Sequence, residues 1–290
     1  MSKEFKSFYK TVEGNEGSKC HYATRLDTYG CGCQHDCSYC YAKSLLSFRG
    51  LWDNEHPAVA DINEIAKIIK TIPKGSVVRL GGMTDCFQPL ELKERVTYRT
   101  IQMLNKAGIE YLIVTKSEIV ARDEYIEILN KDLAHIQITV TCLDDDFYRE
   151  KAYEKASLPS KRIEAILKLQ ELGFDVAIRL SPLIEDYMDF DKLNSLGIEK
   201  AIVEFLRVNH WIKQWFDIDY KKFKIKENGY RHLPIKEKVR IIQQVKIPQV
   251  SVCEDCGGHY NYWKYGFNPN KNDCCNLRRK NGKDPRNATA

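Results

Sequence analysis

The chain has 290 residues, of which 43% are hydrophobic, and its formal net charge is +5. This length allows one large hydrophobic core or two modest ones, and the lack of an apolar run of about 18 residues excludes a membrane-spanning helix. The first residues contain no apolar signal-peptide region. We therefore expect a soluble, cytoplasmic protein without a membrane partner. The mildly basic charge is compatible with nucleic acid but does not require it.

The chain begins with residues 1–20, which are polar, lack periodicity and are expected to form an N-terminal arm. Between residues 21 and 252, β-branched runs alternate with segments whose apolar residues recur at helical spacing. Expected strands cover residues 21–26, 76–82, 110–115, 135–141, 175–180, 201–206 and 248–252. Expected helices cover residues 42–48, 62–72, 91–107, 121–130, 160–172, 189–196 and 235–245.

This alternation predicts an α/β fold with parallel strands, because helical crossovers return the chain to the same end of the sheet. About seven such steps are fewer than the eight of a closed TIM barrel, so we expect a partial (β/α) TIM-like barrel. The functional site is expected where the carboxyl ends of the strands meet. Residues 253–290 depart from the pattern and are expected to form a C-terminal cysteine-rich extension with a basic tail.

Eight of the eleven cysteines fall into two groups, which favours metal binding over a disulfide framework. In the first group, Cys33, Cys37 and Cys40 have the spacing C-x3-C-x2-C, so one loop can direct three thiols at one inorganic centre. A [4Fe–4S] cluster normally takes four thiolates, so three would leave one iron open to a small molecule. Two alternatives remain, a four-thiolate zinc site that includes Cys31 and disulfides.

The spacing of these cysteines, with Tyr39 before the third, resembles the signature of the radical S-adenosylmethionine superfamily. The resemblance implies that Cys33, Cys37 and Cys40 ligate a catalytic [4Fe–4S] cluster and that S-adenosylmethionine binds its open iron. It also implies reductive cleavage of S-adenosylmethionine to a 5′-deoxyadenosyl radical, with an electron donor such as flavodoxin or ferredoxin. Tyr39 would lie beside the adenine of the cofactor.

Gly81 and Gly82 follow the second expected strand, where the superfamily carries a turn that binds the methionine amino group; an ordinary tight turn is the alternative. Thr141, at the rim of the fourth strand, could bind the cofactor's ribose or carboxylate, or only favour the strand. Arg179 lies inside a hydrophobic strand and must be paired or functional. Pairing with Glu204 on the next strand is the alternative to a cofactor or substrate role.

Residues 84–91 have the sequence TDCFQPLE and carry a narrower resemblance. With GCGC at 30–33, CYA at 40–42, VTKS at 114–117 and the PS…R…EA…R…P pattern at 159–182, they resemble the spore photoproduct lyase-like (DNA repair photolyase-like) branch over residues 24–185. The resemblance implies lyase-like radical chemistry, with nucleic acid as one candidate substrate. It makes Lys116 a candidate partner of the cofactor carboxylate, unless it is a solvated lysine. Cys86 is a candidate hydrogen-atom donor, and a buried small hydrophobe is the alternative.

The second group, Cys253, Cys256, Cys274 and Cys275, could hold zinc or a second iron–sulfur cluster, in a structural or an auxiliary role. Cations alternate with aromatic residues at 220–226, and the tail at 278–286 is basic, which suits phosphate contact and base stacking; solvated charge is the alternative. Three functions stay open. They are radical chemistry on nucleic acid, radical modification of RNA, a peptide or a metabolite with an auxiliary cluster, and a non-enzymatic zinc-binding nucleic-acid module.

Overall fold

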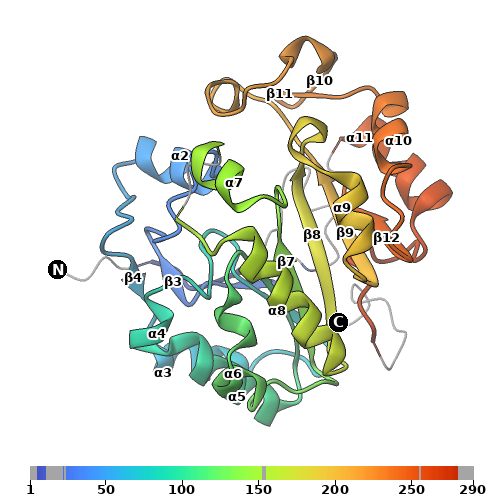
Figure 1. Cartoon of the computed structure of the whole chain (residues 1–290). Helices are drawn as coiled ribbons and strands as arrows, with labels where there is room; N and C mark the ends of the chain where they lie inside the picture. Colours follow the sequence, from blue (N-terminus) through green and yellow to red (C-terminus); the bar gives the residue numbers. More distant parts are fainter. Residues whose placement is uncertain (1–4, 11–21, 23, 152–154, 255, 280–290) are drawn as a thin grey trace.

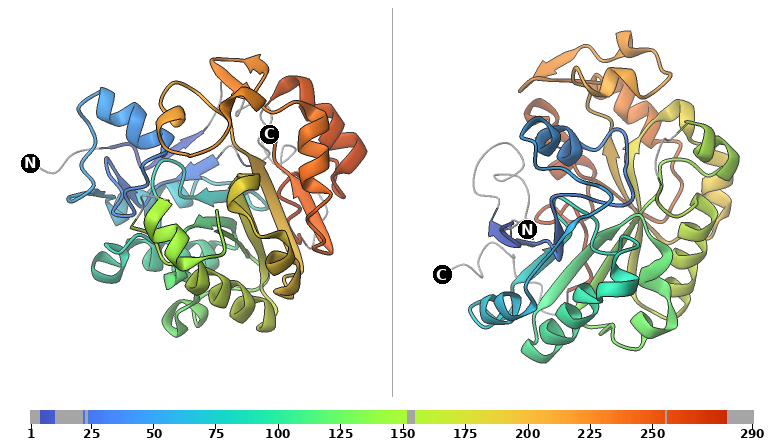
Figure 2. Two further views of the ribbon diagram at one scale, coloured as in Figure 1. Left: turned by 45° about the horizontal axis from the view of Figure 1, so that its top comes forward. Right: turned by 90° about the vertical axis from the view of Figure 1, so that its left-hand side faces the viewer.

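The computed structural model describes residues 5–10, 22, 24–151, 155–254 and 256–279. Eight strands form one sheet in the order β1-β2-β5-β6-β7-β8-β9-β12. The seven strands from β2 to β12 are parallel, and β1 (Phe8–Lys10) joins the edge antiparallel to β2. Within the described residues the two edge strands, β1 and β12, do not pair, so the sheet is an open, partial barrel (Figures 1 and 2). The predicted fold class is confirmed.

The seven parallel strands lie close to their predicted positions. They are β2 (Thr24–Leu26), β5 (Val77–Leu80), β6 (Glu110–Thr115), β7 (Ala134–Thr139), β8 (Asp175–Leu183), β9 (Lys200–Phe205) and β12 (Gln249–Val252). Two short antiparallel pairs lie outside this sheet, β3 (Tyr29–Gly30) with β4 (Ala58–Val59) and β10 (Ile225–Glu227) with β11 (Tyr230–His232).

Most of the predicted helices are also present. They are α2 (Tyr41–Phe48), α3 (Ile62–Ile69), α5 (Val96–Ala107), α8 (Pro159–Glu171), α9 (Phe190–Ser195) and α10 (Ile235–Ile242). The unpredicted helical segments include α7 (Asp145–Lys151), α11 (Gly257–Asn261) and a π-helical segment at Tyr262–Phe267. The helices α2 and α7 and the β10–β11 hairpin gather at one end of the sheet (Figure 1). It is the carboxyl end, since α7 follows β7 and the hairpin follows β9.

Two predicted helices were wrong in extent. The helix expected over 91–107 divides into α4 (Glu91–Glu94) and α5, because Arg95 is left-handed with a φ of 51°. The Glu91 carboxylate then accepts hydrogen bonds from the amides of Thr97 (2.9 Å) and Tyr98 (2.8 Å), which satisfies free donors at the start of α5. The helix expected over 121–130 is reduced to a 3-10 turn at Glu118–Ala121 and to α6 (Asp123–Ile126), with an extended residue between them.

The structure adds detail to two segments of the sequence interpretation, the N-terminal arm and residues 220–226. Of the arm, only residues 5–10 are described, and β1 pairs with the sheet edge instead of lying over it as an irregular segment. In the segment at residues 220–226, Phe223 is buried, and the hydroxyl of Tyr220 donates to the carbonyl of Phe216 at 2.8 Å. The neighbouring lysines are exposed. The structure therefore favours loop-anchoring aromatics beneath solvated charge at residues 220–226.

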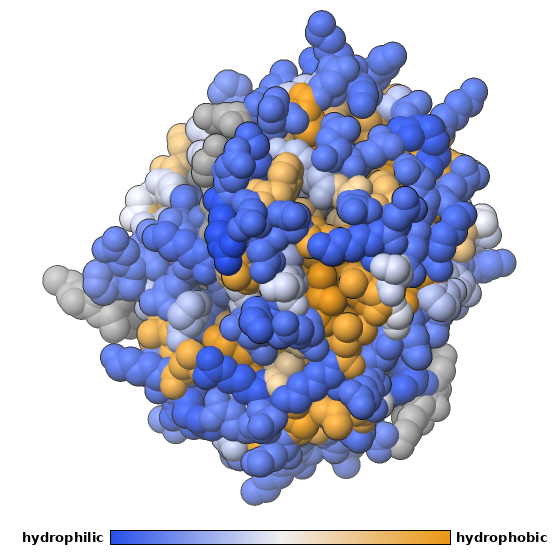
Figure 3. Space-filling model, viewed as in Figure 1, coloured by the Kyte–Doolittle hydropathy of each residue, from blue (hydrophilic) through white to orange (hydrophobic). Residues whose placement is uncertain are grey.

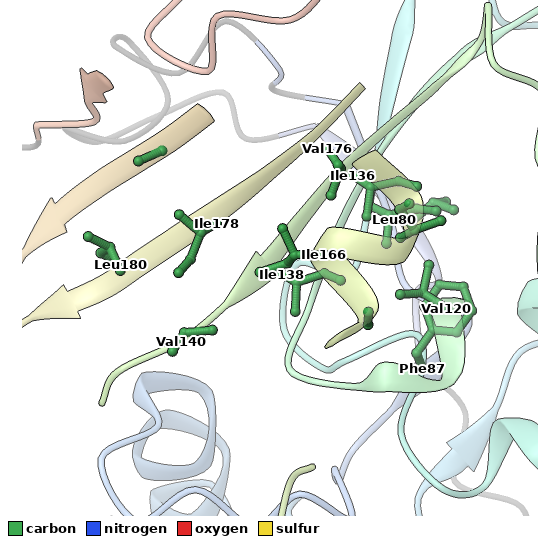
Figure 4. Close-up of a cluster of buried hydrophobic side chains, with 14 of the residues drawn as sticks. Leu80, Phe87, Val120, Ile136, Ile138, Val140, Ile166, Val176, Ile178 and Leu180 are labelled. Carbon is green, nitrogen blue, oxygen red and sulfur yellow. The ribbon is translucent and has the colours of Figure 1, made fainter. Parts of the chain in front are cut away.

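Alternation along the central strands separates an apolar outer face from a polar inner face. The outward-facing side chains belong to one buried cluster with Ile166 of α8 (Figure 4), and they are Ile136, Ile138, Val140, Val176, Ile178 and Leu180, all at most 6% exposed. The intervening residues include Gln137, Thr139 and Arg179, which face the barrel interior. The hydrophobic core therefore lies between sheet and helices, and the interior of the barrel is left for polar chemistry.

The C-terminal segment crosses the amino ends of the strands and closes the barrel from below. Arg279 donates to both oxygens of Glu110 at 2.8 Å and to the carbonyl of Gly75 at 2.7 Å. The amide of Arg278 donates to the Asp175 carboxylate at 2.8 Å. These two arginines of the predicted basic tail therefore bind the barrel itself, which corrects their interpretation as phosphate contacts. Residues 280–290 lie outside the described residues.

A buried ionic network lies in this floor. The imidazole of His135 is 2.6 Å from Asp175 and 3.1 Å from Glu110, and Lys200 is 2.6 Å from Asp175. Burial opposes the charged form of His135, but the hydrogen bonds of its ring to Asp175 and Glu110 outweigh this effect and raise the pKa of His135. In the same way, burial is outweighed by hydrogen bonds from Arg279 and His135, which lower the pKa of Glu110 to about 2.

The outer surface shown in Figure 3 is mainly hydrophilic, with apolar side chains gathered across its middle and lower part. Among the described residues, no helix combines the length and the apolar character needed to cross a membrane.

Candidate functional site

The three cysteines predicted as cluster ligands lie in the loop between β3 and α2. Cys33 is buried, whereas Cys37 and Cys40 are half-buried. Cys37 and Cys40 line a cavity of about 670 Å³ whose wall also includes Lys116, Arg179 and other residues at the carboxyl ends of the strands. The structure therefore places the cysteine loop at the end of the barrel where the site was expected.

Backbone N–H groups point at two of these sulfurs. Those of Asp85 and His35 donate to Cys33, and two in the first turn of α2 donate to Cys40. Burial raises the pKa of both thiols, and the N–H groups act against that rise by stabilising the thiolates. Metal binding requires thiolates, so N–H donors aimed at buried sulfurs suit ligands of a metal cluster.

The TDCFQPLE segment at residues 84–91 contacts the cysteine loop through polar side chains. The Asp85 carboxylate accepts a hydrogen bond from the amide of Lys116 at 2.7 Å and lies 3.3 Å from Nε2 of His35. The fully buried Gln88 accepts one from the amide of Gln34 at 2.8 Å. Both side chains thus fix the cysteine loop to the strand ends.

Thr84 and Glu91 hold the residue that leads into the loop. The hydroxyl of Thr84 donates to the carbonyl of Tyr29 at 2.6 Å. The buried carboxylate of Glu91 accepts hydrogen bonds from the hydroxyls of Tyr29 and Tyr125. Sequence reasoning used this segment only as a family marker and missed its anchoring role. The available signal was the presence of four polar residues, Thr84, Asp85, Gln88 and Glu91, among apolar neighbours.

Glycines in the loop make room for the chain itself. A Cβ on Gly32 would lie 1.8 Å from the carbonyl oxygen of Asp53, and one on Gly30 would lie 2.3 Å from the ring of Phe5. The close contacts of these glycines are therefore with protein atoms. They let the loop pack tightly against the segment that follows α2 and against the N-terminal arm.

Tyr39, Cys40 and Lys116 come together at the cavity wall. The ammonium group of Lys116 hydrogen-bonds to the hydroxyl of Tyr39 and lies 4.5 Å from the centre of its ring. Its charge also acts against the burial that raises the pKa of Cys40. Lys116 is therefore a fixed, partly buried cation beside the cysteine loop, as a partner for a carboxylate should be.

The glycine turn after β5 is held by a residue that the sequence analysis did not name. The Asp27 carboxylate accepts hydrogen bonds from the amides of Gly82 (2.5 Å) and Met83 (3.1 Å). Gly81 has a φ of 78°, which favours glycine. The hydroxyl of Tyr41 donates to the carbonyl of Gly82, so α2 and the turn are joined directly. Neither glycine is among the residues that line the cavity.

Arg179 is paired with Glu204, which is one of the two alternatives that the sequence left open. Its guanidinium donates to Glu204 and to Gln137, both at 2.7 Å, and both charged side chains line the cavity. Thr139 also lines the cavity, but Thr141 does not. The hydroxyl of Thr141 is buried and has no hydrogen-bond partner among the described residues. The structure thus brings Arg179 to the site and leaves Thr141 beside it.

The cavity is positively charged. The cations that line it are Arg25, Arg79, Lys116, Arg179 and Arg207. Its two carboxylates are already paired, Glu204 with Arg179 and Glu254 with the buried Lys238 at 2.5 Å. Arg25 and Arg79 come from neighbouring positions of β2 and β5. Sequence reasoning missed both, although a cation inside a short β-branched run was the signal.

The aromatic side chains of Tyr41, Phe48 and Trp211 also line this cavity and are 44%, 86% and 50% exposed. Since they are exposed while the cations lie deeper in the barrel, the cavity has an aromatic mouth and a cationic interior. Flat aromatic surfaces of this kind can stack on planar ligands.

The second cysteine group is only partly assembled as predicted. Cys253 and Cys274 line the same cavity as the cysteine loop, and Cys274 packs against the small cluster that contains the buried Cys275. Cys256 points elsewhere, because its thiol donates to the carboxylate of Glu227 at 3.2 Å. The structure therefore brings together three of the four predicted thiols.

Cys86 lies away from the cavity. It is 1% exposed and belongs to the hydrophobic core with Phe87, and it is not among the lining residues. Burial raises the pKa of its thiol well above the usual value. The geometry favours the alternative, a small buried hydrophobe, over a hydrogen-atom donor.

The described residues contain no group of three or more His, Cys, Asp or Glu side chains arranged to hold a metal ion. A [4Fe–4S] cluster makes a different demand, because each thiolate binds a different iron and the ligands do not share one centre. The donor set of the loop fits that demand. Three thiols lie on one short loop, N–H groups aim at Cys33 and Cys40, and the Lys116 cation also lies beside Cys40.

Comparison with known proteins assigns the family. Residues 28–193, more than half of the chain, match the family model described as the radical SAM superfamily. The chain therefore belongs to the radical S-adenosylmethionine superfamily, whose members are enzymes that use S-adenosylmethionine and a [4Fe–4S] cluster, as the sequence predicted.

Within that superfamily, the fold is like that of spore photoproduct lyase. One variant of that enzyme has a TM-score of 0.62 at 15% identity, with 84% of this chain and 79% of the other covered. A second, with bound S-adenosylmethionine and dinucleoside spore photoproduct, has a TM-score of 0.58 at 16% identity, with 80% and 76% covered.

Similar sequences are found in archaea and in a virus. An uncharacterised protein of Methanocaldococcus jannaschii is 26% identical over 237 residues, which cover 77% of this chain and 87% of the relative. An uncharacterised protein of Acidianus two-tailed virus is 24% identical over 200 residues, which cover 61% and 65% of the two chains.

Proposed function

We propose that Cys33, Cys37 and Cys40 hold the [4Fe–4S] cluster of this enzyme and that S-adenosylmethionine binds at the same loop. The observation that carries the proposal is the cysteine loop at the cavity, with N–H donors on Cys33 and Cys40 and with Lys116 beside Cys40. When bound, these groups supply reductive cleavage of the sulfonium and hydrogen-atom abstraction from a substrate, with an electron from a donor such as flavodoxin or ferredoxin.

The residues of the chain hold and orient these groups. Lys116 pairs with the carboxylate of S-adenosylmethionine, since its ammonium group is fixed on the ring of Tyr39. Tyr39 lies beside the adenine. Gly82 belongs to the turn that takes the amino group, and the Asp27 carboxylate fixes the shape of that turn. The Arg179–Glu204 pair contributes a polar wall to the cavity interior, where it faces the substrate.

We propose nucleic acid as the substrate class, with lyase-like chemistry. An excess of cations in the cavity suits phosphates, and exposed aromatic rings at its mouth suit stacking on bases. The structural neighbour with bound dinucleoside spore photoproduct is a precedent for such a ligand on this fold. Modification of RNA, a peptide or a metabolite is the competing proposal, favoured by the second group of thiols.

Cofactor chemistry is tested by anaerobic reconstitution with iron and sulfide, reduction, and measurement of 5′-deoxyadenosine formed from S-adenosylmethionine. We expect turnover by the wild type, none by Cys37→Ala and unchanged turnover by Cys142→Ala. Cys142 is the matched control because it is a buried cysteine outside the cavity lining. Turnover by Cys37→Ala equal to that of the wild type would refute the ligand assignment.

The substrate class is tested separately by binding. Fluorescence anisotropy with a labelled thymine-rich single strand, before and after ultraviolet irradiation, should show binding that weakens as salt rises and with Arg79→Gln. Exposed Lys221→Gln is the control, since it lies outside the cavity lining. Product analysis of the irradiated strand then tests for repair. No binding, or binding that Arg79→Gln leaves unchanged, would reject nucleic acid while leaving the cofactor proposal standing.

A further inference from the structure

Three thiols converge on the barrel interior from two separate parts of the chain. Cys253 follows β12, and its amide continues the strand ladder by donating to the carbonyl of Val203 at 2.8 Å. Cys274 and Cys275 come from a tight turn in which the Asp273 carboxylate accepts a hydrogen bond from the amide of Cys275 at 2.8 Å. Cys253 and Cys274 line the same cavity, and Cys274 packs against the small cluster that contains Cys275. The thiols are therefore presented by ordered backbone on both sides.

These thiols share the cavity with the proposed catalytic loop. Cys253 and Cys274 line the cavity, and Cys275 is buried directly next to them, over the apolar floor formed by Tyr22 and Leu112. Arg179 interacts electrostatically with Cys253 and Cys275. A fixed guanidinium can offset the negative charge that several thiolates would bring into a buried site.

The number of thiols distinguishes between the metals considered from the sequence. A closed zinc site needs four ligands, and the fourth cysteine, Cys256, is directed to Glu227 instead. The described residues also contain no three-ligand site for a single ion. A cubane cluster accepts three thiolates and keeps one iron open, and soft thiolates are the ligands that iron–sulfur clusters prefer.

We infer that Cys253, Cys274 and Cys275 hold a second iron–sulfur cluster inside the barrel, with its unligated iron facing the cavity. Because both clusters would border the same cavity, a substrate that enters through the aromatic mouth reaches both. An oxygen or nitrogen atom of that substrate is the ligand the open iron would take. The inference concerns a site separate from the cysteine loop and does not depend on its cluster.

The test is iron and sulfide analysis of the full chain after anaerobic reconstitution, with electron paramagnetic resonance of the reduced protein. We expect about eight irons in the wild type and about four in the Cys33→Ala/Cys37→Ala/Cys40→Ala variant. We expect about four in Cys253→Ser/Cys274→Ser, which leaves the buried Cys275 in place. Cys256→Ser is the matched control and should keep all eight, because its thiol is already engaged outside the group.

Two measurements distinguish loss of the second cluster from a folding defect. Cys253→Ser/Cys274→Ser should keep the four irons of the loop cluster and should unfold in one transition. The inference would be overturned if the wild type held about four irons and this variant retained all of them. It would also be overturned if the wild type held one zinc per chain in place of iron. If instead the proposed loop cluster were absent, the four irons would persist in the loop variant and vanish in Cys253→Ser/Cys274→Ser.

Discussion

Asp85→Asn tests whether the segment after β5 anchors the cysteine loop. Oδ2 of Asp85 accepts the hydrogen bond from the amide of Lys116 at 2.7 Å and lies 3.3 Å from Nε2 of His35. Although burial favours the neutral acid, the neighbouring His35 and the hydrogen bonds hold the pKa of Asp85 below its usual value, so the carboxylate is charged. Asparagine keeps Oδ1 but places an NH2 group where Oδ2 accepts.

The expected cost follows from these contacts. Loss of a buried hydrogen bond to a charged acceptor costs about 1.5–3 kcal/mol, and an amide N–H of Lys116 left without an acceptor adds about 1–3 kcal/mol. We therefore expect the free energy of unfolding of Asp85→Asn to fall by about 3 kcal/mol. Because Asp85 is also linked to His35 in the loop, the variant should lose iron from the loop cluster faster than the wild type.

The assay is urea unfolding of the metal-free protein, followed by iron release from the reconstituted protein to a chelator. Asp61→Asn is the matched control, since Asp61 caps α3 by accepting from the amide of Asn63 at 2.8 Å and asparagine caps a helix equally well. If Asp85→Asn matched Asp61→Asn in both measurements, the anchoring argument would be wrong.

Three further substitutions test other parts of the structure. Gly32→Ala should abolish iron binding by the loop, since its Cβ would lie 1.8 Å from the backbone oxygen of Asp53, while Gly258→Ala, with open space around its Cβ, should leave the iron content unchanged. Glu91→Gln should lower the free energy of unfolding by about 3–5 kcal/mol, because a buried carboxylate that accepts from two hydroxyls and two amides is lost. His135→Gln should destabilise the protein more at about pH 5.5 than at about pH 9, as thermal melting would measure. The raised pKa of His135 contributes stability that is complete below its ordinary value of 6.5 and is lost as pH rises through the raised one. Equal destabilisation at both pH values would contradict the buried ion network.

The sequence by itself determined the features that depend on local spacing. Helical and two-residue periodicities are properties of short segments, and they predicted all seven parallel strands and most helices. The spacing of Cys33, Cys37 and Cys40 is equally local, so three thiols on one loop could be recognised before any tertiary contact was known. The same holds for Lys116, whose position after a predicted strand already placed it at the carboxyl end of the sheet.

Tertiary structure alone decided which distant groups meet. Gln34 and Gln88 are 54 positions apart, and no periodicity links them, yet their hydrogen bond helps to hold the loop. Cys256 has the spacing of a metal ligand, but the β10–β11 hairpin brings Glu227 to its thiol. Arg279 looks like part of a solvated basic tail until the chain end passes beneath the barrel and meets Glu110. Such pairings depend on the energy of the whole packed chain, because each polar group that folding buries takes whichever partner the packing brings within reach.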